Sequence, residues 1–331
     1  MHIKKLVAFL IVIVLAQLAL GQVTYKSTVT SDGFMGMGAF TSNANTYIID
    51  NAQRSETDLK FTGKFMRHFS PKGTQVSIIR LDKELVWNLD TEKKTYTEQT
   101  FGEIKEMMEQ SAEGAEQPTP EENADYESDY NWSKPKVAVE NLKESKDING
   151  FHCNHYLATV TTIGTHKETG VKDTMLFAAD LWNSKDVTKN MELVYDFNKR
   201  YLKAIGIDVP ENAGLAMISG MYQEQMQILE DEIQKLDGYA IINDMKLTMT
   251  KNAIPEEGAE TEDDVTLRDI QRDFGGLLGK KLVKKATDKK KEEKKSSVTE
   301  LFHMKTEVTS ISAENIADTK FEVGKGYKLK K

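Results

Sequence analysis

The residues best suited to chemistry stand together at His152, Cys153 and His155. Imidazole and thiolate are ligands for zinc and copper, and on a strand Cys153 and His155 would share one face while His152 pointed to the other. The histidines that could complete such a site from elsewhere are His68, His166 and His303. Three partly buried strand residues without a metal explain the pattern more simply. We therefore expect no metal and no cofactor, and nothing beside Cys153 in the sequence would lower its pKa for a nucleophilic role.

Sequence patterns of common enzymes are absent from the chain. It has no His-Glu-x-x-His, no Gly-x-Ser-x-Gly, no EF-hand loop and no dinucleotide-binding fingerprint. Residues 275–281 match a phosphate-binding loop only in part, because Phe274 and Lys281 replace the required glycine and hydroxyl residue. Acidic residues are numerous, but no pair is marked as the two carboxylates of a glycoside hydrolase. We expect a protein that is not an enzyme, with an unrecognised hydrolase as a minor alternative.

The composition excludes several classes of protein. Across 331 residues, 44 Lys and Arg face 52 Asp and Glu, which gives a net charge of −8. Nucleic-acid binding needs a concentrated cationic surface, so nucleic acid is not the expected partner. The single cysteine, Cys153, excludes an internal disulfide framework and a multi-cysteine zinc site.

The first 21 residues have the pattern of a cleaved signal peptide. Lys4 and Lys5 precede an apolar run over residues 6–20, and Ala19 and Gly21 form a small-x-small cleavage pattern before Gln22. As a helix, the run would be about 22 Å long, which is shorter than the hydrocarbon core of about 30 Å. No cysteine follows the small residue, so a lipoprotein is not expected. The mature protein should be exported, soluble, and periplasmic or extracellular.

The remaining sequence predicts an antiparallel sheet with helical interruptions. Alternating or apolar runs separated by short polar turns are typical of hairpins, because parallel neighbours need long crossovers. We expect strands near residues 23–29, 47–49, 76–81, 85–89, 95–97, 137–139, 151–162, 175–182, 239–250 and 300–311. Apolar residues at helical spacing predict helices near 101–108, 187–205 and 211–236.

Three charged segments interrupt this pattern. Acidic loops are expected near residues 113–129 and 256–264, and a Lys-rich helical insertion near 265–295. Within the insertion, Lys280–Lys295 carries nine lysines against three acids. A solvated insertion explains this composition, and a peripheral contact with anionic membrane lipids is the alternative.

Several segments resemble a family of exported Gram-negative bacterial proteins that is catalogued as a domain of unknown function. The resemblance rests on Leu85–Tyr96 leading into a helix at Thr100, on Ile148–Phe151 before a long strand, and on Phe321–Tyr327 near the end. Gly324 stands where the closing motif of that family often has proline. We associate the family with the lipoprotein-carrier (LolA/LolB-like) half-barrel. The resemblance implies an α+β fold for residues 22–331, a single domain in which a strongly curved antiparallel β-sheet (half-barrel) packs over amphipathic helices.

Such a fold leaves an apolar cleft between sheet and helices, so we expect a binding protein for a lipid, an acyl chain or a lipidated peptide. Burying each CH₂ group of such a ligand contributes about 0.8 kcal/mol to the free energy of binding. The candidate lining residues are Trp87, Ile241, Met245, Leu247, Met249, Phe302 and Met304. A packed core without space for a ligand is the simpler reading of the same residues. A different function, a structural or interaction protein that binds a protein partner through its acidic loops or Lys280–Lys295, is the alternative.

Overall fold

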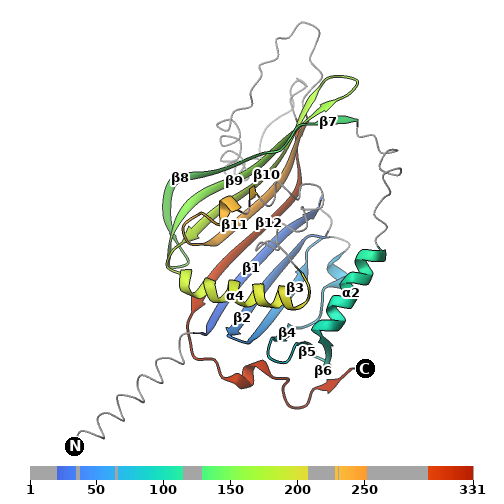
Figure 1. The fold of residues 1–331 in the computed structure, drawn as a ribbon, viewed down its shortest axis with the longest axis vertical. Helices are drawn as coiled ribbons and strands as arrows, with labels where there is room; N and C mark the ends of the chain where they lie inside the picture. Colours follow the sequence, from blue (N-terminus) through green and yellow to red (C-terminus); the bar gives the residue numbers. More distant parts are fainter. Residues whose placement is uncertain are drawn as a thin grey trace, which may run out of the picture.

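The computed structural model describes residues 21–34, 38–63, 66–114, 129–207, 228–229, 231–251 and 297–330. These residues form one open sheet of thirteen strands (Figure 1), in the order β13-β6-β5-β4-β3-β2-β1-β12-β11-β10-β9-β7, with β8 also paired to β9. All neighbouring strands are antiparallel except β13 and β6. Several expected segments lie outside the described residues. They are residues 1–20 of the signal peptide, most of the first acidic loop, most of the helix near 211–236, all of the second acidic loop and the Lys-rich insertion.

The N-terminal half of the sheet is a meander of consecutive hairpins. Its strands are β1 (Val23–Phe34), β2 (Phe40–Ile49), β3 (Ala52–Phe61), β4 (Gln75–Arg80), β5 (Leu85–Asp90) and β6 (Thr95–Thr100). The short polar turns predicted before β5 and β6 are confirmed, and each contains a residue with positive φ, Glu84 and Lys94. These turns keep β4, β5 and β6 in immediate antiparallel contact.

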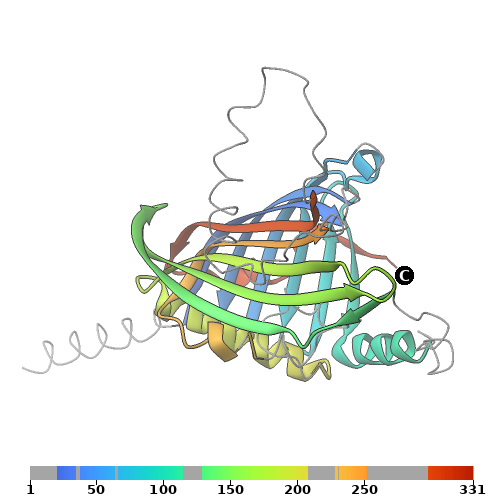
Figure 2. The same ribbon diagram turned by 90° about the horizontal axis from the view of Figure 1, so that it is seen from above.

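The second half contains longer strands and joins the first at the centre of the sheet. Its strands are β7 (Tyr130–Trp132), β8 (Lys136–Ile148), β9 (Phe151–His166), β10 (Lys172–Ser184), β11 (Tyr239–Lys251) and β12 (Ser297–Ser312). Asn149 and Gly150 both have positive φ and make the tight turn from β8 to β9, as expected of an Asn-Gly hairpin. Because β12 pairs with β1, strands far apart in the sequence meet at the centre of the sheet. Figure 2 shows the strands of the two halves turned relative to each other, which is the ordinary twist of a large sheet.

The predicted α+β class, with a half-barrel packed over amphipathic helices, is wrong, because the described part of the chain is mainly β. Its long helices are α2 (Phe101–Gly114) and α4 (Thr188–Ala204), accompanied by the short 3₁₀ turns η1 (Met66–Phe69) and η2 (Asp318–Phe321). Figure 1 shows α4 crossing one face of the sheet near the ends of β1 and β2, while α2 lies beside β6. Within the described residues, the helices therefore cover part of one open sheet and do not form a layer beneath a strongly curved half-barrel.

The difference comes from polar segments that pair as strands. β3 (AQRSETDLKF) and residues 140–147 of β8 lack the apolar alternation that marks a half-buried strand. They still complete backbone hydrogen bonds with β2, β4 and β9, and most of their side chains are at least partly exposed. Backbone pairing does not require apolar side chains, so the sheet is larger than the hydrophobic pattern indicates.

The two predicted helices that are fully described are confirmed. α2 begins with a capping box, in which Thr100 Oγ1 accepts a hydrogen bond from the Glu103 N–H at 3.1 Å and Glu103 Oε2 accepts one from the Thr100 N–H at 2.7 Å. α4 places Val194 and Phe197 against Val23 and Ile48 of the sheet. This contact fixes α4 across the first strands.

The C-terminal segment after β12 closes the core of the N-terminal half. Ile316 and Phe321 are buried against a cluster that includes Ile78 and Trp87. Outside the cluster, Arg80 forms ion pairs with Asp82 and Glu322. The last strand, β13 (Lys328–Leu329), then pairs with β6 at the edge. Within the described ranges, no helix is long and apolar enough to cross a membrane.

Candidate functional site

The candidate site lies on one face of the second half of the sheet. Side chains two residues apart on a strand share a face, so Ala179, Leu181 and Asn183 of β10 point to the same side. Met245 of β11 stands opposite Ala179 on one neighbour and opposite Met304 of β12 on the other. The three strands thus present a continuous and mainly apolar surface.

Two elements cover this surface and leave a pocket. The helix α4 contributes Thr188, Met191 and Tyr195, and the segment that precedes β11 contributes residues between Ile233 and Tyr239. Figures 1 and 2 show α4 and the segment before β11 on the same side of the sheet. The pocket between them and the strands has a volume of about 670 Å³.

A glycine sets the distance between the covering segment and the sheet. Gly238, just before β11, has a φ of +77°, and a Cβ atom there would lie 2.3 Å from the Ser184 carbonyl oxygen at the end of β10. Only glycine permits both the backbone conformation and this approach. The pocket wall is therefore positioned by a backbone contact.

Two asparagines give the pocket its most unusual polar feature. Asn183 and Asn243 both line it, and the Oδ1 atom of each is buried without a hydrogen-bond partner among the described residues. Asn183 is only 4% exposed. An unsatisfied buried acceptor costs about 1–3 kcal/mol, so these groups favour a hydrogen-bond donor nearby.

The opposite face of the same strands carries a row of charged groups. His155 Nδ1 lies 3.0 Å from Glu144 Oε2, and its Nε2 lies 3.0 Å from Asp180 Oδ1. Asp180 stands directly opposite Asp244 on the next strand. His303 Nε2 lies 2.9 Å from Asp244 Oδ1.

The carboxylates change the proton affinity of both histidines. Burial opposes the charged form of His155, but Asp180 and Glu144 outweigh it, so the pKa of His155 is raised. The hydrogen bond to Asp244 is the main reason why the pKa of His303 is raised. Burial alone would raise the pKa of the Asp244 carboxyl, but His303 and Lys246 keep it below its usual value. The carboxylates thus favour the protonated form of both imidazoles.

The sequence-predicted lining residues do not all come together. Met245 and Met304 line the pocket, and Leu247 packs against the same core cluster. Phe302 is buried opposite Leu247, and Met249 stands opposite Met175 and Thr299. Ile241 lies in a different cluster with Trp182, and Trp87 lies far along the sheet with Ile78.

The cluster His152, Cys153 and His155 is not a shared site in the structure. His152 is exposed and bonds to Asp147, whereas Cys153 is fully buried, and burial raises the pKa of its thiol. His155 stacks on Trp182 with a ring separation of 4.0 Å. The side chains therefore have separate partners.

Sequence reasoning missed several residues of the pocket. Tyr25 and Ser27 come from β1, and Met191 and Tyr195 come from α4, all distant in sequence from β11. Their positions depend on the pairing of β1 with β12 and on how α4 crosses the sheet. Asn243 gave the one available signal, since it interrupts an apolar strand face.

Comparisons with known proteins add no assignment. Neither a scan against protein-family models nor a search of curated proteins finds a match to the chain.

Proposed function

We propose that the protein binds an amphipathic ligand, such as a lipid, an acyl chain or a lipidated peptide, in the pocket between β10–β12 and α4. The observation that carries this proposal is the pocket of about 670 Å³ with its mainly apolar wall. Small-molecule sites are typically apolar hollows of about 300–1,000 Å³ with a few polar groups. The pocket has both properties.

The apolar wall suits a flexible chain. Met191, Met245 and Met304 line the pocket, and unbranched methionine side chains adapt to irregular apolar shapes. Each CH₂ group moved from water to this wall contributes about 0.8 kcal/mol. Asn183 and Asn243 provide acceptors for a polar group at one part of the ligand.

The position of the ionisable groups favours binding over catalysis. Asp180 and Asp244 belong to the face opposite Leu181, Asn243 and Met245, because side chains alternate along each strand. Their histidine partners lie on that same opposite face. A ligand in the pocket would thus be separated by the sheet from the charged row. We further propose that this binding takes place after export, on the basis of the signal-like residues 1–21.

The proposal is tested by filling the pocket. Thr306 of β12 lines the pocket, whereas Thr248 of β11 lies on the opposite face and is also a half-buried strand threonine. We expect Thr306→Trp to weaken binding of a fluorescent long-chain fatty acid by at least about tenfold, since displacing two CH₂ groups costs about 1.6 kcal/mol. Thr248→Trp should leave the affinity unchanged.

Fluorescence titration of the purified protein measures both affinities, and circular dichroism checks that both variants fold. The proposal fails if the wild-type protein does not bind the probe, or if the two tryptophan variants bind it equally well.

A further inference from the structure

Two irregularities in adjacent strands meet at one place on the charged face. Between β1 and β12 the pairing passes from Ser31↔Met304 to Gly33↔His303, so Asp32 is an extra residue. Between β11 and β12 it passes from Leu247↔Phe302 to Thr248↔Glu300, so Leu301 is also extra. Such β-bulges re-aim side chains and are over-represented beside functional sites.

The bulge at Leu301 changes the face on which Glu300 lies. In a regular strand, Glu300 and His303 would point to opposite faces, because they are three residues apart. With the extra residue, Glu300 pairs with Thr248 and His303 pairs with Lys246, two positions that share a face of β11. The second bulge adds Asp32 from β1, where Ser31 Oγ donates a hydrogen bond to the His303 carbonyl oxygen at 3.1 Å.

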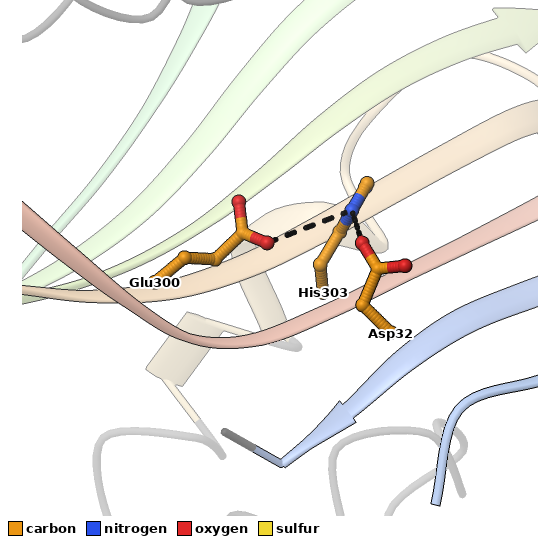
Figure 3. Close-up of side chains that lie close together, drawn as sticks. All are labelled: Asp32, Glu300 and His303. Carbon is orange, nitrogen blue, oxygen red and sulfur yellow. Dashed lines mark hydrogen bonds and ion pairs between the residues drawn. The ribbon is translucent and has the colours of Figure 1, made fainter. Parts of the chain in front are cut away.

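The three side chains converge on one small volume. His303 Nδ1 lies 3.0 Å from Asp32 Oδ2 and 4.0 Å from Glu300 Oε1 (Figure 3). One nitrogen and two carboxylate oxygens thus lie within 4.8 Å of one another. Asp32 and Glu300 are exposed, so an ion could reach them from solvent.

The other nitrogen of His303 is already engaged. Its Nε2 lies 2.9 Å from Asp244 Oδ1, which directs Nδ1 toward Asp32 and Glu300. Histidines that bind metals almost always donate their second N–H to a carboxylate or carbonyl in this way. Asp244 thus occupies the position of an orienting partner outside the three ligand atoms.

We infer that Asp32, Glu300 and His303 form a binding site for a divalent transition-metal ion of the zinc type. Zinc accepts histidine nitrogen and carboxylate oxygen at about 2.0–2.2 Å, and three protein ligands leave one position for water or a further ligand. Two carboxylates and a neutral imidazole balance the charge of the ion. The imidazole favours such a metal over Mg²⁺ or Ca²⁺, which prefer oxygen ligands alone.

Calorimetric titration of the purified protein with Zn²⁺ tests the site. We expect one ion per chain with saturable binding, and affinities for Mg²⁺ and Ca²⁺ at least about tenfold weaker. His303→Ala should reduce the zinc affinity by at least about 100-fold, and Asp244→Asn by about 10–100-fold.

His155→Ala is the matched control. His155 lies on the same sheet face and also contacts two carboxylates, but its nitrogens face Glu144 and Asp180 separately. This variant should retain the wild-type zinc affinity. Asp32→Asn and Glu300→Gln alter exposed side chains and keep the test valid if His303→Ala does not fold.

The inference is overturned if the wild-type protein does not bind Zn²⁺, or if Asp32→Asn, Glu300→Gln and His303→Ala all bind it as tightly as the wild type. Binding of Mg²⁺ or Ca²⁺ with equal affinity would also overturn it, because the imidazole would then have no part. Thermal unfolding with and without Zn²⁺ gives a second readout. The ion should raise the melting temperature of the wild type and of His155→Ala but not that of His303→Ala.

Discussion

His155 illustrates how single residues on the charged face affect stability. Its imidazole lies between Glu144 and Asp180 and stacks on Trp182. The Trp182 ring also contacts Lys146, whose Nζ lies 3.6 Å from the ring centroid. The carboxylates raise the pKa of His155 above its ordinary value of 6.5. Protonation of His155 and folding therefore favour each other.

The sign of the pH dependence follows from this shift. Because the folded pKa is higher than the unfolded pKa, the stabilisation by His155 is complete below about pH 6.5 and is lost as pH rises through the folded value. We expect His155→Gln to reduce the free energy of unfolding more at about pH 5.5 than at about pH 9. Urea unfolding of both proteins at the two pH values measures the difference. An equal loss at both would show that the carboxylates do not stabilise the charged imidazole.

At this scale the sequence identifies some site residues but not the site. Met245 and Met304 follow from period-two alternation on β11 and β12. Asp32 and Glu300 do not, because regular alternation places Glu300 and His303 on opposite faces and only the bulge at Leu301 reverses this. A bulge depends on the pairing of strands that are far apart in sequence, so no local pattern reveals it.

Among the elements, the segment after β12 packs on the core of the N-terminal half and closes it. Phe321 is 1% exposed and lies in the cluster with Ile78 and Trp87. Arg80 and Lys83 hold the next residue, Glu322, by ion pairs. The segment thus acts as the cover of the β4–β6 meander.

Replacing Phe321 with alanine should leave a cavity in this cluster and destabilise the fold. We expect Phe321→Ala to lower the free energy of unfolding by about 3–5 kcal/mol, the usual cost of truncating a buried phenylalanine. Leu329→Ala, at a side chain that is 49% exposed on the edge strand, should change it by less than about 0.5 kcal/mol. Denaturant unfolding measures both. Similar values for the two variants would contradict the packing of Phe321.

The sequence predicts elements well where a turn or a helix has local chemistry. The turns at Glu84 and Lys94, the Asn149-Gly150 hairpin and the start of α2 at the Thr100 capping box all depend on neighbouring residues. β3 is missed because its pairing with β2 and β4 is made by backbone groups, and its side chains alternate little between apolar and polar. Apolar periodicity reveals a strand only when one of its faces is buried, and most side chains of β3 are only partly buried or exposed.

The whole molecule differs from the expected architecture in its balance of strands and helices. The antiparallel pairing is confirmed, but the polar strands make the sheet larger than the apolar pattern indicates. α4 alone, among the helices fully described, crosses the sheet face. Global shape depends on how many strands pair, and that number cannot be read from apolar residues alone.

Export is tested on the full chain. We expect the mature protein to begin at Gln22, because Ala19 and Gly21 mark the cleavage site. Expression in a Gram-negative bacterium, followed by intact-mass measurement of the extracellular and periplasmic fractions, checks this. Gly21→Arg should leave the precursor uncut, since the peptidase requires a small residue there. A wild-type protein that retains residues 1–21 in the cytoplasm would contradict the signal.

The pairing of β1 with β12 has a consequence for the order of assembly. Thr24 pairs with Ser312, so one side of β1 stays unpaired until β12 has been synthesised. Contacts of such wide sequence separation slow folding and leave an unpaired edge open to wrong partners in the meantime. In a nascent or truncated chain that ends before β12, the strands before α2 and the strands after it would form two separate groups. Each group would have an unpaired strand edge where β12 belongs, β1 in one and β11 in the other. The two halves of the sheet can therefore join only after β12 has been synthesised.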